Sequence, residues 1–492
     1  MRIDGFLANI LSKRFAAVRN VARRCVLHMV LTGMRGRDSG RTARSRRWGA
    51  CCGAATIFVA SAPSSAFSQA ISPLTPPALP PWNAETVFEP VPYAQFWSRY
   101  PGEKIEPEDT PVMTRQWPGY EPKGIRAHSW MFYPSFSVGG LYDSNVFASN
   151  SDKKSDIAAV VSPSLRIASL WDKHQLTFDG YVKSERYSHY ASLDQTDASA
   201  RLKGRIDLRH DSAILYNFQA AYLHEAVGSL SSPLGAVEPT PYTRIHENVT
   251  YWHQFKRLSV SFGIRNDNYR FGSTRAQDGS TINQDSRDGS VYAGHSRIDY
   301  AFTGNLGMFT AFEANIRDFR GSPTGSLSSR GYRSLTGFNF NLTHLISGEI
   351  GAGYTSQRFD NPTIGTVTDP AFRAMLKWSP TRAIDVTAKA EEITTEAVET
   401  VASAVRAQSV MLGVDYAFRR NVVLSAGGAY ENDKFVGQDR QDNVYSATAS
   451  VQYLLNHYSS VGLRYRYVNR DSSLSTAIYD KHEIALDVTA HF

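Results

Sequence analysis

The sequence has very few cysteines and no long apolar run. Its three cysteines, Cys25, Cys51 and Cys52, all lie within the first 70 of its 492 residues. Beyond residue 70 there is therefore no thiol for a disulfide or for cysteine-based chemistry. No segment approaches the roughly 18 consecutive apolar residues of a transmembrane helix. Any membrane crossing must use β-strands, whose alternating pattern hides their hydrophobicity.

Sequence motifs of hydrolytic chemistry are missing as well. There is no His-Glu-x-x-His zinc motif and no Gly-x-Ser-x-Gly nucleophile turn. Because function must be argued from a site and no site is visible, the sequence predicts no enzyme and no cofactor or metal. A hydrolytic site on the rim of a barrel is kept as an alternative, with these histidines available: His189, His210, His224, His246, His253 and His295.

The net charge of +7 is unevenly distributed. Residues 1–70 hold 12 of the 53 Lys and Arg residues and two of the 46 Asp and Glu residues, so the remainder is near −3. This distribution argues against a nucleic-acid partner. A basic cluster at 41–47, an apolar stretch at 50–62 and the small residues before Ala70 predict that 1–70 is a signal peptide or leader. We expect cleavage after Ala70.

Residues 71–130 form a proline-rich segment. Twelve of the 22 prolines lie between 71 and 128, which disfavours regular helices and strand ladders. The segment is interpreted as a periplasmic extension. Trp82, Trp97 and Trp117 suggest that parts of it dock on another surface, and a poorly ordered extension is the alternative.

From residue 131 to 492 the pattern becomes alternating. Leu258, Val260 and Phe262, for example, are separated by serines. Eighteen such segments, from 131–142 to 479–492, are joined by alternately short and long connections. This predicts an all-β protein, a transmembrane antiparallel β-barrel of about 18 strands with both ends on the periplasmic side. A propeller would need a 40- to 45-residue repeat, which is absent. A soluble sandwich is the remaining alternative.

Aromatic residues support the barrel over the sandwich. They recur at the last apolar position before a short turn, where rings would gather at one membrane interface. The residues concerned are Trp171, Phe255, Phe302, Trp378, Phe418 and Phe492.

The final segment, EIALDVTAHF, alternates to its last residue. Leu486, Val488 and Phe492 share the apolar parity. The ending resembles the carboxy-terminal insertion signal of bacterial outer-membrane proteins, which the barrel-assembly machinery recognises. It departs from that signal at Ala490, where a second aromatic is common.

A short motif follows the first strand. Residues 140–147 read GLYDSNVF and resemble the GxxYDDNVF opening of a bacterial family of "putative β-barrel porins" of the second type, with Ser144 in place of the second Asp. The matching positions are Gly140, Tyr142, Asp143, Asn145, Val146 and Phe147. The resemblance implies a wide outer-membrane barrel of a Gram-negative bacterium, and several members are associated with export of exopolysaccharide or capsule.

The polar parity is expected to line a water-filled lumen. The basic residues on this parity that we expect to line the pore are Lys183, Arg201, Lys203, Arg205, Arg209, Arg373, Lys377, Arg464 and Arg466. Such rows can select anions, or they can pair with facing acids and stiffen the wall.

The predicted function is a porin conduit in the outer membrane. Polysaccharide export is the favoured role, with polysaccharide and a periplasmic export partner as expected contacts besides membrane lipid. A general diffusion porin for small anionic solutes and a barrel adhesin or scaffold are the alternatives.

Overall fold

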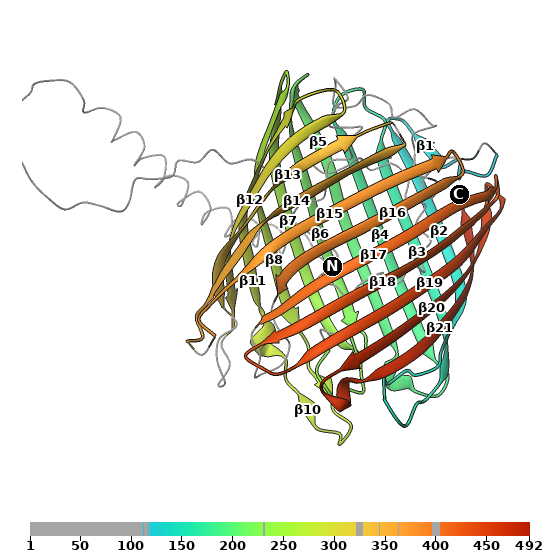
Figure 1. The fold of residues 1–492 in the computed structure, drawn as a ribbon. Coiled ribbons are helices and arrows are strands. Elements are labelled where there is room, and N and C mark those ends of the chain that lie inside the picture. Colours follow the sequence, from blue (N-terminus) through green and yellow to red (C-terminus); the bar gives the residue numbers. More distant parts are fainter. Residues whose placement is uncertain are drawn as a thin grey trace, which may run out of the picture. The chain divides into compact units, whose positions relative to one another are not determined.

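The computed structural model describes residues 112, 117 and 119–492, except 230–231, 321–327, 344, 363 and 396–403. The predicted leader 1–70 and most of the predicted extension 71–130 lie outside the described residues. In the described part, 18 long antiparallel strands follow one another around a barrel (Figure 1).

The first nine barrel strands are β2 (Trp130–Asp143), β3 (Asp156–Ser169), β4 (Gln175–Tyr187), β5 (Gln195–Arg209), β6 (Ser212–Glu225), β7 (Thr240–Phe255), β8 (Leu258–Phe271), β11 (Gly289–Ala301) and β12 (Leu306–Phe319). The remaining nine are β13 (Ser329–Asn341), β14 (Ile346–Phe359), β15 (Thr366–Thr381), β16 (Ile384–Thr395), β17 (Ala404–Arg419), β18 (Val422–Val436), β19 (Gln441–Asn456), β20 (Ser459–Ser472) and β21 (Tyr479–His491).

The other elements are short. Strand β1 (Ile125–Ala127) pairs with the start of β2, and β9 (Thr274–Arg275) pairs with β10 (Thr281–Ile282) in a loop. Three 3-10 turns lie in other loops: η3 (Ala191–Leu193), η4 (Asp285–Arg287) and η5 (Ser475–Ala477). Within the described ranges, no helix has the length and apolar character needed to span a membrane.

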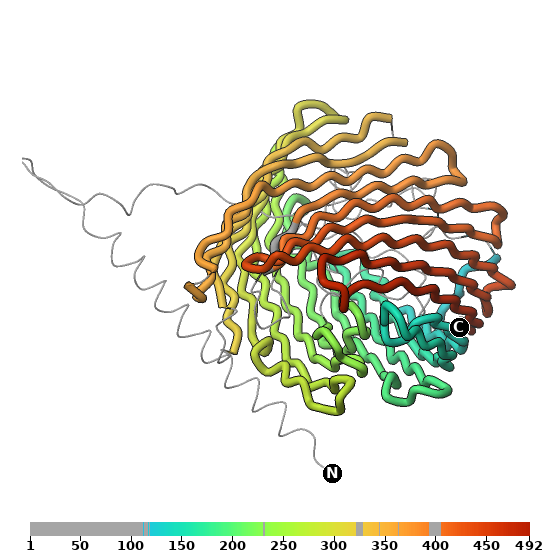
Figure 2. Tube along the Cα trace, turned by 60° about the horizontal axis from the view of Figure 1, so that its bottom comes forward, coloured from blue at the N-terminus to red at the C-terminus, as the bar shows by residue number. Residues whose placement is uncertain are grey.

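The barrel closes by pairing its last strand with its first. Residues Ser135–Asp143 of β2 pair antiparallel with residues 491 to 483 of β21, and the Phe492 N–H donates to the Pro134 carbonyl oxygen at 3.2 Å. Figure 2 shows the resulting ring, with the cyan β2 beside the dark red β21. Closure leaves no open sheet edge, which a membrane-spanning sheet requires because lipid offers no hydrogen bonds.

The two ends of the barrel differ in their connections. Connections of two to five residues join the strands at one end, here called the short-turn end, and connections of four to 17 residues join them at the other, the long-loop end. Both the start of β2 and the end of β21 lie at the short-turn end. The prediction of about 18 antiparallel strands with alternating short and long connections is confirmed.

Side chains alternate between the outer and inner faces of the wall. On β21, Leu486 and Val488 are 53% and 52% exposed, whereas Asp487 and Thr489 are 3% and 2% exposed. Leucine and valine therefore point outward and the polar residues inward. An apolar outer face and a polar inner face are the arrangement that a membrane barrel needs.

Aromatic side chains form two outward bands. All six aromatics that the sequence placed before short turns or at the last residue, from Trp171 to Phe492, are exposed by 41–56%. A second set, absent from our sequence prediction, consists of exposed tyrosines in the strand halves nearer the long loops: Tyr142, Tyr222, Tyr292, Tyr332, Tyr354, Tyr430 and Tyr445. Rings at two depths match the two interfaces of a bilayer.

Candidate functional site: the barrel interior

Part of the inner wall is a dense network of buried charges. On β11, the Arg297 guanidinium lies 2.8 Å from an Asp299 carboxylate oxygen and 2.9 Å from one of Glu349 on β14. Asn339 on β13 donates from Nδ2 to Asp299 at 3.0 Å, and Arg373 on β15 lies 3.7 Å from Glu349. Since a lone buried charge is very unfavourable, these cross-strand pairs are what make the charges tolerable, and they tie β11 to β15.

Apolar side chains adjoin this network. Phe309, Ala311, Leu335 and Ala371 are each at most 2% exposed and form one inward cluster, and the Arg297 guanidinium lies 4.1 Å from the Phe309 ring centre. This side of the interior is therefore packed, and it rigidifies the wall.

The predicted pore-lining cations on β5 and β15 mostly have partners in the wall. Arg205 pairs with Asp207 at 2.6 Å, and Arg201 donates to the Gln219 side-chain oxygen at 3.3 Å. Arg373 belongs to the network above. Lys203 and Lys377 are half-buried on their strands, and Arg209 is exposed beyond a register shift in β5.

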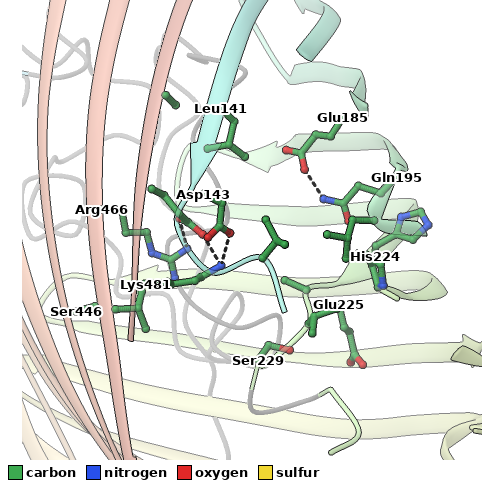
Figure 3. Close-up of a pocket in the computed structure, with 18 of the residues that line it drawn as sticks. Leu141, Asp143, Glu185, Gln195, His224, Glu225, Ser229, Ser446, Arg466 and Lys481 are labelled. Carbon is green, nitrogen blue, oxygen red and sulfur yellow. Dashed lines mark hydrogen bonds and ion pairs between the residues drawn. The ribbon is translucent and has the colours of Figure 1, made fainter. Parts of the chain in front are cut away.

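A cavity of about 260 Å³ opens in the interior towards the long-loop end. Figure 3 shows side chains from the first strands, such as Asp143 and Glu185, facing others from the last strands, such as Arg466 and Lys481. The first and last strands share this cavity because the barrel closes between them.

Three predicted pore-lining cations are gathered at this cavity. Lys183 pairs with Glu185 at 2.5 Å, and Arg466 pairs with Glu483 at 3.2 Å. Arg464 also lines the cavity and makes no ion pair with any described residue.

The carboxylates Asp197, Glu225 and Glu431 also line the cavity. Uncharged groups complete the lining. They include the tyrosines Tyr187 and Tyr479 and the apolar residues Leu141, Val160, Val444 and Val468. The cavity thus presents carboxylates, hydroxyls, the guanidinium of Arg464 and apolar patches to a solute. Protein sites hold small polar ligands with such mixtures of polar and apolar groups.

Lys481 is the centre of a buried charge cluster at the seam between β2 and β21. Its ammonium lies 3.0 Å from Asp143 on β2 and 2.6 Å from Glu483 on its own strand. The sequence analysis did not select Lys481, although it shares the inward parity of Glu483 in the last segment. The pair with Asp143 ties the last strand to the first at the long-loop end.

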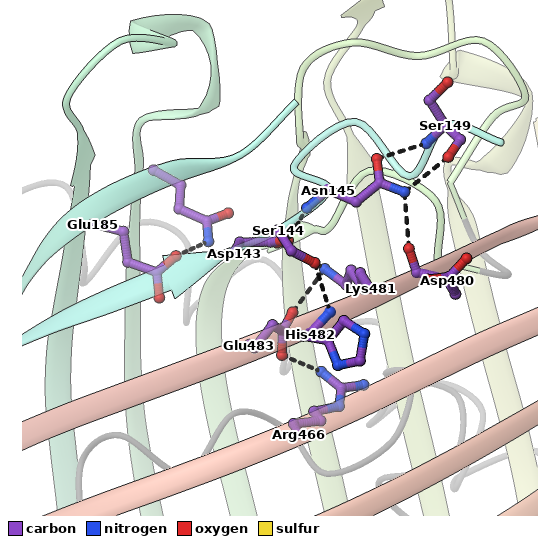
Figure 4. Close-up of polar contacts among 11 residues, drawn as sticks. Asp143, Ser144, Asn145, Ser149, Glu185, Arg466, Asp480, Lys481, His482 and Glu483 are labelled. Atoms are coloured by element: carbon purple, nitrogen blue, oxygen red, sulfur yellow. Dashed lines mark hydrogen bonds and ion pairs between the residues drawn. The ribbon is translucent and has the colours of Figure 1, made fainter. Parts of the chain in front are cut away.

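Asn145 of the family motif holds the loop after β2. It is fully buried, and its Nδ2 donates to the carbonyl oxygens of Ser149 at 2.8 Å and Asp480 at 2.9 Å. Its Oδ1 accepts from the Ser149 N–H at 3.0 Å, and its own N–H donates to Asp143 Oδ1 at 2.8 Å (Figure 4). The motif therefore fixes the loop against β21.

Ser144 also holds the start of this loop against β21. Its N–H donates to the His482 carbonyl oxygen at 3.0 Å, and its Oγ accepts from the His482 N–H at 2.8 Å (Figure 4). Serine at this motif position thus continues the pairing of the chain with β21 beyond the end of β2.

Hydrophobic motif residues pack the loops onto one another. Val146 lies in a buried cluster with Leu193 and Val227, which come from the loops after β4 and β6. Phe147 meets Tyr190 edge to face at a ring separation of 5.0 Å. These contacts cap one side of the cavity with loop residues.

The same loops reach the last strands. Ala148 packs against Val468 on β20 and Tyr479 on β21. Gly228, at φ +76°, lies so close to Ala148 that a Cβ on residue 228 would collide with it. The loops after β2 and β6 therefore narrow the interior at the cavity.

The other motif residues and the residues of the predicted assembly signal lie in the wall or at its end. Gly140 and Tyr142 are on β2, with Tyr142 39% exposed on the outer face. Leu486, Val488 and Phe492 are exposed on the outer side of the closing strand.

The described residues contain no cluster of three or more His, Cys, Asp or Glu side chains suited to a metal ion. The histidines kept for a rim site are dispersed instead. His224 contacts Asp197 at 2.8 Å in the cavity wall, and His246 contacts Asp267 at 2.8 Å on another pair of strands.

No curated protein matches the sequence. Among solved structures, Pseudomonas aeruginosa OccK5 (OpdH) is 13% identical with a TM-score of 0.38 over 73% of this chain and 98% of that one. P. aeruginosa OpdL is 13% identical with a TM-score of 0.40, over 74% of this chain and 99% of that one. Acinetobacter baumannii OccAB3 is 11% identical with a TM-score of 0.41, over 74% of this chain and 100% of that one.

A family match covers most of the chain. Residues 117–492, which include every barrel strand and the 140–147 motif, match the family described as "Putative beta-barrel porin 2". The chain belongs to this β-barrel porin family.

Proposed function

We propose that the protein is a water-filled conduit for hydrophilic solutes across the outer membrane of a Gram-negative bacterium. One observation carries this: a closed barrel of 18 described strands with an apolar outer face and an inner face rich in charged residues. Barrels of 16–18 strands are wide enough for an aqueous channel, whereas about eight strands leave room only for side chains. The unpaired Arg464 and the cavity support a path for solutes.

The proposal includes the orientation of the barrel in the outer membrane and the signals that bring the chain there. The short-turn end faces the periplasm, as is usual for bacterial barrels, and the long loops face outward. Residues 1–70 act as the export leader, and the outward Leu486, Val488 and Phe492 serve as the signal read by the barrel-assembly machinery.

We favour extracellular polysaccharide as the cargo. This part rests on the resemblance of the 140–147 motif to a family with members associated with polysaccharide export. Arg464, Arg466 and Lys183 at the cavity would suit the carboxylates of acidic sugars. A periplasmic export partner would then meet the short-turn end.

A diffusion porin for small anions is the second candidate. The observation in its favour is the narrowing of the interior by the loops after β2 and β6, next to a cavity of about 260 Å³. A site of this size suits a single small solute better than a chain of sugars.

These proposals can be tested by measuring the conductance of the purified protein and by studying a strain that lacks it. Purified protein in planar bilayers should conduct ions, and an absence of conductance would refute the conduit. Loss of surface polysaccharide with normal uptake of small anions would support export. Normal polysaccharide with reduced uptake of small anions would identify the diffusion porin instead.

A further inference from the structure

The cavity at the long-loop end has two faces with opposite charge. Its acidic face, on β4–β6, carries three carboxylates and one ammonium: Glu185, Asp197, Glu225 and Lys183. Its basic face, on β20 and β21, carries four cations and one carboxylate: Arg464, Arg466, Arg470, Lys481 and Glu483. Figure 3 shows Glu185 and Glu225 on one side of the cavity and Arg466 and Lys481 on the other.

Most of these charges have a partner of opposite sign close by. On the acidic face, Glu185 pairs with Lys183 at 2.5 Å, and Glu225 pairs at 2.7 Å with Arg287 of η4. On the basic face, Glu483 pairs with Arg466 and with Lys481, which also holds Asp143 of β2. Glu431 of β18 is the remaining carboxylate of the lining. These pairs leave little net charge on the groups that form them.

Arg464 and Asp197 lack a permanently charged partner, one on each face. Arg464 is half-buried and makes no ion pair with any residue that the structure describes. Asp197, also half-buried, contacts Nδ1 of His224 at 2.8 Å, and an imidazole is charged only when it is protonated. No Lys or Arg in the described ranges pairs with Asp197. Because a poorly solvated charge is unfavourable, each of the two groups favours a counter-charge brought by a solute.

Uncharged residues separate these two groups along the wall. Strand pairing leads from Arg464 through Ala485, Leu141 and Ala158 to Tyr187 on β4. Leu141 and Tyr187 both line the cavity. A solute that reaches from one face to the other therefore passes an apolar surface between its two charged contacts.

We propose that the cavity binds a small zwitterion of the ω-amino acid type, with its carboxylate at Arg464, its ammonium at Asp197 and its apolar stem against Leu141. The site names a solute class for the proposed conduit, and it rests on that function for access through the barrel interior. A simple anion would meet the excess of carboxylates on the acidic face, and a simple cation would meet the guanidiniums on the basic face. A cavity of about 260 Å³ suits one small solute.

Titration calorimetry on the purified full-length protein in detergent tests the binding. The probes are 6-aminohexanoate and its two singly charged analogues, hexanoate and hexylammonium. Because each analogue lacks one charged contact, 6-aminohexanoate should bind about tenfold or more tighter than either. Hexanoate binding as tightly would identify an anion site instead, and hexylammonium binding as tightly would identify a cation site. Either result, or no binding of any probe, would overturn the proposal.

Two variants test the assignment of the charged contacts. Arg464→Gln should remove the preference for 6-aminohexanoate over hexylammonium and keep the preference over hexanoate. Asp197→Asn should do the reverse. A variant that migrates as a folded, heat-modifiable barrel but keeps both preferences, or loses both, would contradict the contact assigned to that residue.

Matched controls make the same changes away from the cavity. Arg257→Gln and Asp172→Asn alter exposed residues in connections at the short-turn end. Both variants should keep both preferences. If either control loses a preference, the effect of the corresponding site variant does not depend on the cavity, and the assignment fails.

The outcomes separate this proposal from the conduit, because binding in detergent requires no conduction. A protein that prefers 6-aminohexanoate but does not conduct ions would refute the conduit and retain the binding site. A protein that conducts ions but binds the three probes equally would refute the zwitterion site and leave the conduit intact.

Discussion

Asn145 satisfies backbone groups from two distant parts of the chain: Ser149 in its own loop and Asp480 just before the last strand's charge cluster. Replacing it with alanine would leave these buried groups without partners. We expect Asn145→Ala to lower the free energy of unfolding by about 1–3 kcal/mol. Denaturant unfolding in detergent micelles, followed by tryptophan fluorescence, measures the loss.

Asn150 provides the matched control for this prediction. It lies in the same loop but is exposed, so Asn150→Ala should change stability by no more than about 0.5 kcal/mol. Similar losses in the two variants would show that the buried hydrogen bonds of Asn145 do not stabilise the barrel.

The sequence could identify the motif, but it could not show which contacts each motif residue makes. The resemblance selected Asp143 and Asn145, yet their partners Lys481 and Asp480 lie about 340 positions later, and only barrel closure brings them together. The alternating pattern of its strand was enough to predict that Arg466 points inward. Its pairing with Glu483 depends on the register between β20 and β21, which a single segment does not contain.

The alternation of side chains between the outer and inner faces of a strand can be tested by substitution. Leu463, near the middle of β20, is 46% exposed on the outer face. If this face meets lipid, Leu463→Arg should destabilise the folded barrel by about 2–4 kcal/mol, because a charge near the bilayer midplane is poorly solvated. Equilibrium unfolding from phospholipid vesicles gives the value.

Lys203→Arg is the control, since it keeps a positive charge on the inward face of β5. It should have little effect on stability. A barrel that tolerated both substitutions equally would contradict the assignment of outer and inner faces.

Strands were the most predictable elements because a period of two is repeated 18 times. The short elements were not predictable. Strand β1 exists because it pairs with β2, and β9 and β10 pair within a loop of mixed composition. Irregular registers, such as the shift between Asp207 and Arg209, leave no mark in the alternation and move Arg209 out to an exposed position.

At the scale of the whole molecule, closure creates the features that the sequence did not contain. The cavity is shared by the first and last strands, the loop after β2 packs on β20 and β21, and Val112 is buried against β16–β18. All of these contacts join segments that are far apart in the chain. Composition and alternation predict the wall but say nothing about what lies inside it.

The role of Phe492 in assembly of the barrel can be tested against a second aromatic residue. Phe492 and Phe418 are both aromatic residues at the short-turn end, 56% and 52% exposed, so they form a matched pair. If Phe492 is read by the barrel-assembly machinery, Phe492→Asp should strongly reduce the amount of heat-modifiable protein in the outer membrane. Phe418→Asp should cost only about 0–1 kcal/mol near the interface and leave the amount close to that of the wild type. Gels of membrane fractions run with and without boiling compare the two. An equal reduction in both would mean that Phe492 serves only as one more ring of the interfacial band, and an unchanged level in Phe492→Asp would exclude it from assembly.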